Sequence, residues 1–158
     1  MYQLFIVLMM SALIGTYVTI VSEQRDEITP AEARTLALNL AMYRTAVIRY
    51  VQSNPNAGFR GSVSNSVLPD VGAYVPNTLW RNYVSGSTVV VYAASLPGVN
   101  IVGDLESIAY GSVFAGAAYD GTVVADPNAV APSGVSLPAA VAGNIPNGAP
   151  VWEALDVF

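Results

Sequence analysis

The sequence predicts an α+β protein: an N-terminal transmembrane helix, then an amphipathic helix packed on an antiparallel β-sheet. Three observations support this fold class. Residues 1–21 are almost entirely apolar and uncharged, residues 33–51 repeat apolar side chains at helical spacing, and the rest alternates short β-rich runs with turn residues. We therefore expect a transmembrane helix over residues 1–22 and a globular domain over residues 23–158.

The apolar run of residues 1–21 is long enough to cross a membrane, since a helix needs about 20 residues to span a hydrocarbon core of roughly 30 Å. The run lacks the basic start and small-residue cleavage site of a signal peptide, which favours a retained anchor. A cleaved signal and a helix buried in an assembly are the alternatives. Arg25 and Arg34 follow the run, but they leave its orientation open because long domains are translocated largely regardless of flanking charge.

Small residues recur within the predicted anchor. Ser11, Gly15 and Thr19 lie four residues apart, so they share one face of a helix. Small side chains at this spacing let two membrane helices approach closely. We expect this face to contact another helix, although small residues are common enough in such segments that chance is an alternative.

The second helix is expected from about residue 30 to residue 52. Thr29 can cap its first turn, Pro30 suits the first helical position and Glu32 completes a capping box. Apolar residues then recur at spacings of three and four, namely Ala33, Leu36, Leu40, Tyr43, Val47, Tyr50 and Val51. The polar, glycine-containing run of residues 53–58 ends the helix.

The other side of this helix combines polar and apolar residues. Arg34, Thr45, Arg49 and Gln52 form a narrow polar strip, and Leu38 and Met42 lie beside or within it. Single apolar residues are common on protein surfaces, so Leu38 and Met42 could be ordinary surface residues. Alternatively, this side of the helix meets another helix or another subunit.

Turn residues predict the strands that follow. Residues 80–84 and 88–93 flank Ser-Gly-Ser, and residues 112–119 and 122–124 flank Asp-Gly, a pair that favours a type I′ turn. We expect a β-hairpin at each place. A short helix is expected within residues 99–108, mostly loop within residues 125–149, and a last strand over residues 151–155.

The composition argues against an enzyme. The chain has no Lys, His or Cys, so the commonest general base, the commonest transition-metal ligand, thiolates and Schiff bases are all missing. Carboxylates such as Asp104 and Glu106 have ordinary structural or solvating explanations. The net charge of −5 argues against direct nucleic acid binding. We expect no catalytic residues, cofactor, metal or small-molecule substrate, and a membrane-tethered envelope hydrolase is a remote alternative.

Several segments resemble a known family. Residues 34–40 and 42–47 with Tyr50 and Asn54-Pro55, together with residues 80–83 and 136–140, are similar to the PilM proteins that accompany the thin, type IVb pili of conjugative plasmids. The resemblance implies a small, non-enzymatic inner-membrane protein of the pilus assembly apparatus or basal body. Its globular domain would lie in the bacterial periplasm, and its partners would be other pilus proteins or copies of itself.

The overall plan is also similar to type IV pilins. These proteins join an N-terminal hydrophobic helix to an amphipathic helix and an antiparallel sheet, and Pro30 could supply the bend that their helix often contains. Pilins typically carry Glu at the fifth mature position, whereas this chain has Phe5. The alternative function is therefore a pilin-like subunit that polymerises through its N-terminal helix into an extracellular filament.

Overall fold

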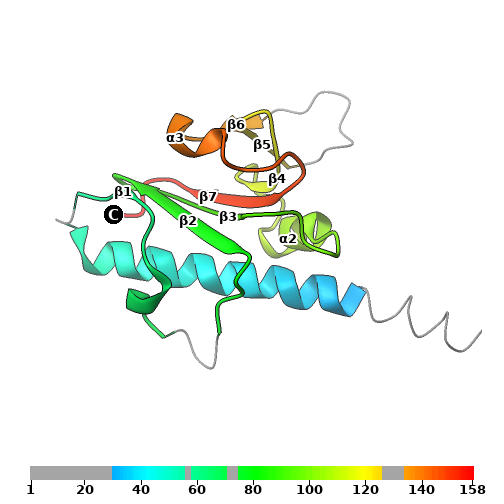
Figure 1. Cartoon of the computed structure of the whole chain (residues 1–158), viewed down its shortest axis with the longest axis horizontal. Helices are drawn as coiled ribbons and strands as arrows, with labels where there is room; N and C mark the ends of the chain where they lie inside the picture. Colours follow the sequence, from blue (N-terminus) through cyan, green and yellow to red (C-terminus); the bar gives the residue numbers. More distant parts are fainter. Residues whose placement is uncertain (1–29, 56–57, 71–74, 126–133) are drawn as a thin grey trace, which may run out of the picture. The chain divides into compact units, whose positions relative to one another are not determined.

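A computed structural model describes residues 30–55, 58–70, 75–125 and 134–158. Their centre is a seven-stranded sheet in which every neighbouring pair is antiparallel, with the order β1-β2-β3-β7-β4-β5-β6 (Figure 1). The strands are β1 (Arg60–Gly61), β2 (Trp80–Ser85), β3 (Thr88–Ala93), β4 (Ala115–Tyr119), β5 (Thr122–Val124), β6 (Gly134–Ser136) and β7 (Pro150–Ala154). The α+β class with an antiparallel sheet is thus confirmed.

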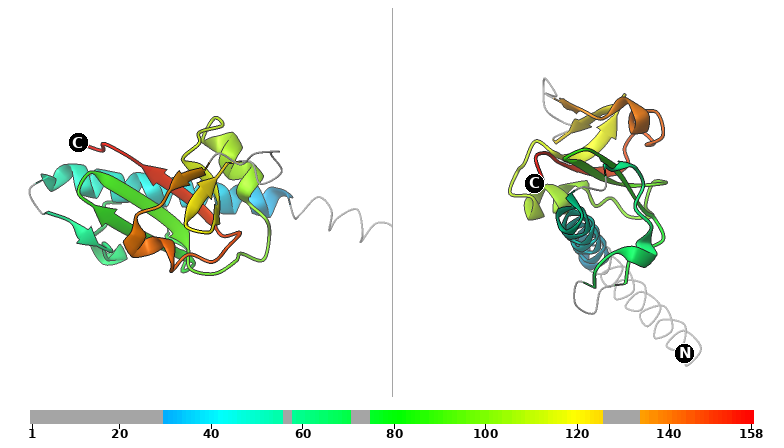
Figure 2. Two further views of the ribbon diagram at one scale, coloured as in Figure 1. Left: turned by 90° about the horizontal axis from the view of Figure 1, so that it is seen from above. Right: turned by 90° about the vertical axis from the view of Figure 1, so that its left-hand side faces the viewer.

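The helix over residues 30–53, hereafter the long helix, runs along one face of the sheet beneath β2, β3 and β7 (Figures 1 and 2). Its sheet-facing side is buried and consists of Ala33, Ala37, Leu40, Tyr43, Val47 and Val51. Burying this stripe against the sheet removes apolar surface of both elements from water, which is the main force that holds them together. The predicted amphipathic packing is confirmed.

Cross-strand register decides which side chains meet the long helix. Asn82 of β2, Val91 of β3 and Trp152 of β7 lie opposite one another in a row. Asn82 contacts Tyr43 of the long helix, so this row faces the helix. Because side chains alternate between the faces of a strand, Glu153 points to the opposite face.

Both predicted hairpins are confirmed. β2 and β3 pair up to Ser85 and Thr88, which leaves a two-residue loop. In the second hairpin, Asp120 and Gly121 have positive φ angles of 47° and 76°. A type I′ turn requires positive φ at both central residues, so the Asp-Gly signal correctly predicted the backbone conformation.

The C-terminal half departs from expectation in two places. Residues 134–149 contain β6 and the short helix α3 (Ala139–Ala142), where mostly loop was expected. A Cβ at position 134 would lie 2.8 Å from the Thr122 Cβ, so glycine lets β6 approach β5. We predicted a loop here because glycine usually weakens a strand, and the composition does not show that this glycine allows close packing instead. The helix expected within residues 99–108 is α2 (Val102–Ile108), which begins later than expected and packs beside β4.

No helix in the part of the chain that the structure describes is long and apolar enough to cross a membrane. The predicted transmembrane helix of residues 1–22, with Ser11, Gly15 and Thr19, lies outside the described residues, as do Phe5 and Thr29. These predictions stay predictions.

Candidate functional site

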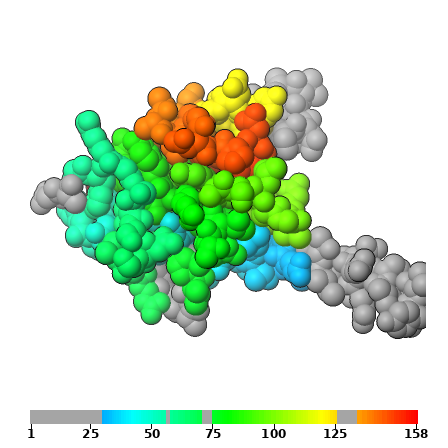
Figure 3. All heavy atoms as spheres, in the orientation of Figure 1, coloured from blue at the N-terminus to red at the C-terminus, as the bar shows by residue number. Residues whose placement is uncertain are grey.

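One flank of the long helix is covered by the chain between β1 and β2. The Asn39 side chain accepts a hydrogen bond from the Trp80 Nε1–H (2.7 Å) and donates one to the Val75 carbonyl oxygen (3.2 Å). From this side, the green atoms that precede and enter β2 lie over the middle of the helix and leave its blue N-terminal turns in view (Figure 3). This flank is therefore already occupied.

The other flank is held by the C-terminal part of the chain. Gln52 donates a hydrogen bond from Nε2 to the Val157 carbonyl oxygen (2.9 Å). Earlier in the helix, the Arg44 guanidinium lies over the Trp152 ring, with Cζ 4.5 Å from the ring centroid. The long helix is thus packed on its sheet side and contacted along both flanks.

A narrow face of the long helix stays open to solvent, and we call Arg34, Leu38, Met42 and Arg49 the outer strip. All four residues are exposed, with Leu38 and Met42 at 45% and 37% of their full accessibility. Leu38 and Met42 are four residues apart and therefore adjacent on the helix surface. The structure places both residues where the sequence predicted, away from the buried face.

The outer strip carries positive charge on an acidic protein. Within the described ranges, neither the Arg34 nor the Arg49 guanidinium makes a hydrogen bond or ion pair with another described residue. The net charge of the whole chain is −5. The strip therefore presents two adjacent apolar side chains with an exposed arginine on either side, which suits contact with another molecule more than internal packing.

A buried polar network lies on the sheet side of the long helix. Asn82 is 3% exposed, and its amide donates to the Val63 carbonyl oxygen (2.8 Å) and the Tyr43 hydroxyl (2.6 Å), while its Oδ1 accepts from the Val63 N–H (2.6 Å). The Tyr43 hydroxyl donates to Asn65 Oδ1 (2.9 Å). Burial raises the pKa of Tyr43, so its hydroxyl stays protonated at neutral pH. This network ties the helix, β2 and the chain after β1 together, which is a structural role.

Two charged residues that sequence reasoning did not single out, Glu153 and Arg44, are wholly and partly removed from water, respectively. Glu153 is 3% exposed, and its Oε2 has no hydrogen-bond partner. Burial raises the pKa of Glu153 and lowers that of Arg44. They lie on opposite sides of β7, so they do not neutralise each other. No local sequence signal marks either residue, because their burial results from packing between distant segments.

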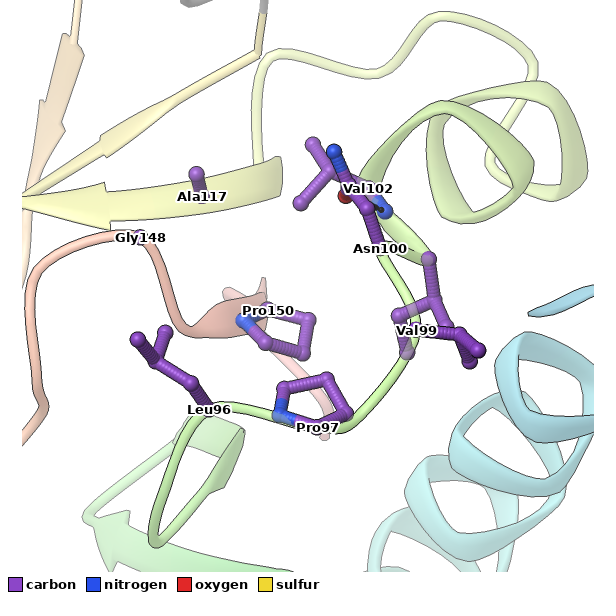
Figure 4. A pocket seen from close by; sticks show the side chains of 9 residues that line it. Leu96, Pro97, Val99, Asn100, Val102, Ala117, Gly148 and Pro150 are labelled. Carbon is purple, nitrogen blue, oxygen red and sulfur yellow. Dashed lines mark hydrogen bonds between the residues drawn. The ribbon is translucent and has the colours of Figure 1, made fainter.

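A pocket of about 300 Å³ opens between the loop that joins β3 to α2, strand β4 and the start of β7 (Figure 4). Its wall is largely apolar and is formed by Leu96, Pro97, Val99, Asn100, Ile101, Val102, Ala117, Gly148 and Pro150. The one polar side chain, Asn100, already accepts a hydrogen bond from the Val102 N–H (3.0 Å). Ligand sites usually add a few convergent polar groups to an apolar wall, and this wall has a single polar side chain. Elsewhere among the described residues, no three His, Cys, Asp or Glu side chains are grouped to hold a metal ion.

The comparison with protein families decides the identity. A family model named PilM matches residues 8–153, which is most of the chain. The chain belongs to the PilM family. The resemblance of its helix and strand segments to PilM proteins is thereby confirmed, and with it the relation to pili.

A solved structure shares this fold. A crystal structure described as protein PilM from Escherichia coli B7A has 22% sequence identity and a TM-score of 0.50, covering 79% of this PilM-family chain and 93% of that chain. Another, described as a pilM protein from Pseudomonas aeruginosa 2192, has 25% identity and a TM-score of 0.38, covering 76% and 93%. No curated protein matches the chain significantly.

Proposed function

We propose that this PilM-family protein is a non-enzymatic structural component of a type IVb, conjugation-type pilus, acting in the assembly apparatus or basal body through protein–protein contacts. Residues 1–21 anchor it in the bacterial inner membrane, and the globular domain lies in the periplasm. Family membership supports the relation to pili. The absence of Lys, His and Cys from the sequence supports a role in binding instead of catalysis.

The outer strip is the observation that carries this proposal. Leu38 and Met42 are exposed in the middle of the long helix, which is packed on its sheet side and contacted along both flanks. Apolar residues four apart on a helix are the usual anchors for docking into the groove of another protein. The flanking Arg34 and Arg49 complement acidic residues, so the partner is a pilus protein whose apolar groove is bordered by carboxylates. Ser11, Gly15 and Thr19 supply a second contact, with a partner helix in the membrane.

Leu38→Ser combined with Met42→Ser tests the outer strip. The full-length variant is expressed in a pilus-forming strain that lacks the native copy, and pili are counted by electron microscopy. We expect few or no pili and normal amounts of the protein in membranes, because both substituted side chains are already exposed and do not support the core. Val67→Ser combined with Val113→Ser removes two equally exposed apolar side chains elsewhere and should leave piliation unchanged.

Photo-cross-linking identifies the partner directly. A benzophenone amino acid at position 42 should capture a pilus protein that mass spectrometry can name, whereas the same group at position 67 should not. If the Leu38/Met42 double variant forms normal pili and the position-42 probe captures no pilus protein, the role given to the strip is wrong.

A filament subunit is the second candidate. The outer strip leaves the long helix open along one face, and a filament in which copies pack through their helices also needs such a face. Mass spectrometry of purified filaments separates the two functions. Abundant copies of this chain in filaments would establish the subunit, while its presence in membranes and absence from filaments would support the assembly role.

A further inference from the structure

The guanidinium of Arg44 lies over an aromatic ring and makes no ion pair with a described residue. The residue lies half-buried on the flank of the long helix that faces β7, with its guanidinium over the Trp152 ring. Trp152 is fixed by its neighbours in the sheet, since Val91 and Ala115 lie opposite it on either side and both are buried. The ring is therefore a rigid platform for the cation.

One hydrogen-bond donor of Arg44, its Nε–H, is unsatisfied. Its Nε is buried and has no partner, and no carboxylate in the described ranges lies within ion-pair distance of the guanidinium. The contact with Trp152 joins the charge to the ring and leaves the Nε–H without an acceptor. Arg81 shows the contrast, because its Nη1 donates to the carbonyl oxygens of Thr78 and Trp80, both at 2.8 Å. A buried polar group without a partner is costly, so a guanidinium left in this state is suited to bind an external acceptor.

We propose that Arg44, supported by Trp152, is a binding site for a carboxylate, supplied either by an acidic side chain of a partner protein or by a free carboxylate. The planar guanidinium matches the two oxygens of a carboxylate in a bidentate pair. This site lies on a flank of the long helix, apart from the outer strip, and its existence does not depend on the proposed pilus function.

The charge at the site favours a carboxylate over a phosphate. A carboxylate carries one negative charge and neutralises one guanidinium, whereas a phosphate group carries about −1.5 to −2 at neutral pH. Phosphate sites therefore gather several cations or free backbone amides, and among the described residues no second cation acts measurably on Arg44. Burial makes the match in charge more important, because excess charge is poorly solvated there.

The site can be tested by NMR on the ¹⁵N-labelled full chain in detergent micelles. Arg44→Lys identifies the Arg44 Nε–H signal by its disappearance. Sodium acetate and the capped peptide acetyl-Ala-Glu-Ala-amide are then titrated at constant ionic strength, with sodium chloride and sodium phosphate as comparisons. We expect acetate and the peptide to shift the Arg44 signal saturably, the other arginine signals to move little, and Arg49→Gln on the same helix to leave the response intact.

The outcomes separate the sources of the carboxylate. A saturable response to both acetate and the peptide assigns the site to acidic side chains, and a response to acetate alone assigns it to a free carboxylate. The proposal is overturned if chloride produces the same shift, if phosphate binds more tightly than acetate, or if all arginine signals move together.

Discussion

At the scale of single residues, the side chain of Asn82 makes the hydrogen bonds that a neighbouring strand would otherwise make to Val63. Strand β1 pairs only with the end of β2 at Val84 and Ser85, so the chain after β1 has no ladder to join beside Asn82. The carboxamide of Asn82 replaces that ladder, because it accepts from the N–H and donates to the carbonyl oxygen of Val63. It also donates to the Tyr43 hydroxyl, so one side chain joins three segments.

Asn82→Ala should therefore destabilise the protein strongly. The substitution leaves the Val63 N–H and the Val63 carbonyl oxygen without their side-chain partner, and each unsatisfied buried group costs about 1–3 kcal/mol. It also removes one of the two hydrogen bonds of the Tyr43 hydroxyl, which still donates to Asn65 Oδ1. We expect the free energy of unfolding to fall by at least about 2 kcal/mol in urea denaturation of the full chain. Asn144→Ala is the matched control, because Asn144 is exposed and bonds only to the Ala140 carbonyl oxygen. Equal losses in the two variants would contradict this role.

Glu153 makes stability depend on pH. Burial raises its pKa in the folded protein above the ordinary value of 4.5. The folded state then holds the proton more tightly than the unfolded state, so this stabilisation is complete below about pH 4.5 and is lost as pH rises through the folded-state pKa. Glu153→Gln removes the effect. We expect the free energy of unfolding of Glu153→Gln, minus that of the native protein, to increase from about pH 4.5 upward and then level off.

Urea denaturation of both proteins at several pH values between 4 and 8 measures this difference. Other carboxylates contribute equally to both proteins and cancel. A difference that stays constant with pH, or that falls as pH rises, would show that Glu153 is not held protonated by burial.

Individual residues also show which contacts could be predicted from the sequence and which could not. The exposure of Leu38 and Met42 followed from helical periodicity, because the spacing of the buried residues fixes which side of the helix is left over. The pairing of Arg44 with Trp152 and the bonds of Asn82 to Val63 join segments far apart in the chain. No periodicity or turn signal connects such segments, so these contacts required the structure.

At the scale of elements, periodicity and turn residues predicted helices and strands correctly, whereas composition alone did not. The long helix and both hairpins were correctly predicted because apolar periodicity and turn residues act over a few positions. Strand β1 was not predicted, since two residues cannot show an alternating pattern. The expectation of mostly loop missed β6 and α3, because a glycine that packs and a glycine that breaks a strand look alike in composition.

Gly116 of β4 illustrates such a packing glycine. A Cβ at this position would overlap the Val124 carbonyl oxygen and lie 2.8 Å from the Ala125 Cα, and these backbone atoms cannot move without shifting β5. Gly116→Ala should lower the free energy of unfolding by about 1–3 kcal/mol. Gly103→Ala, in the first turn of α2 with nothing within 4 Å of the new Cβ, should instead raise it by up to about 0.5–1 kcal/mol. Thermal denaturation of both variants checks the opposite signs, and a neutral Gly116→Ala would contradict the close approach of β4 and β5.

At the scale of the whole molecule, the last strand of the chain lies in the middle of the sheet. The sequence predicted a strand near residues 151–155 but not its place in the strand order. Its neighbours are β3 and β4, which belong to different hairpins and do not pair with each other. β7 also provides Trp152 beneath Arg44, and the tail after it accepts a hydrogen bond from the long helix. One segment therefore joins both hairpins and the helix into one core.

Removing residues 148–158 should consequently abolish cooperative folding, although all other strands and the helices remain. Without β7, the ladder edges of β3 and β4 are unpaired, and Val91 and Ala115 lose the strand between them. We expect circular dichroism in detergent to show no sharp thermal transition and trypsin to cleave the globular part rapidly. Deletion of Phe158 alone is the control, because its side chain is largely exposed and β7 stays intact. If the chain without β7 still unfolds in a single cooperative transition, the hairpins and the long helix form a core by themselves, and β7 does not unite the fold.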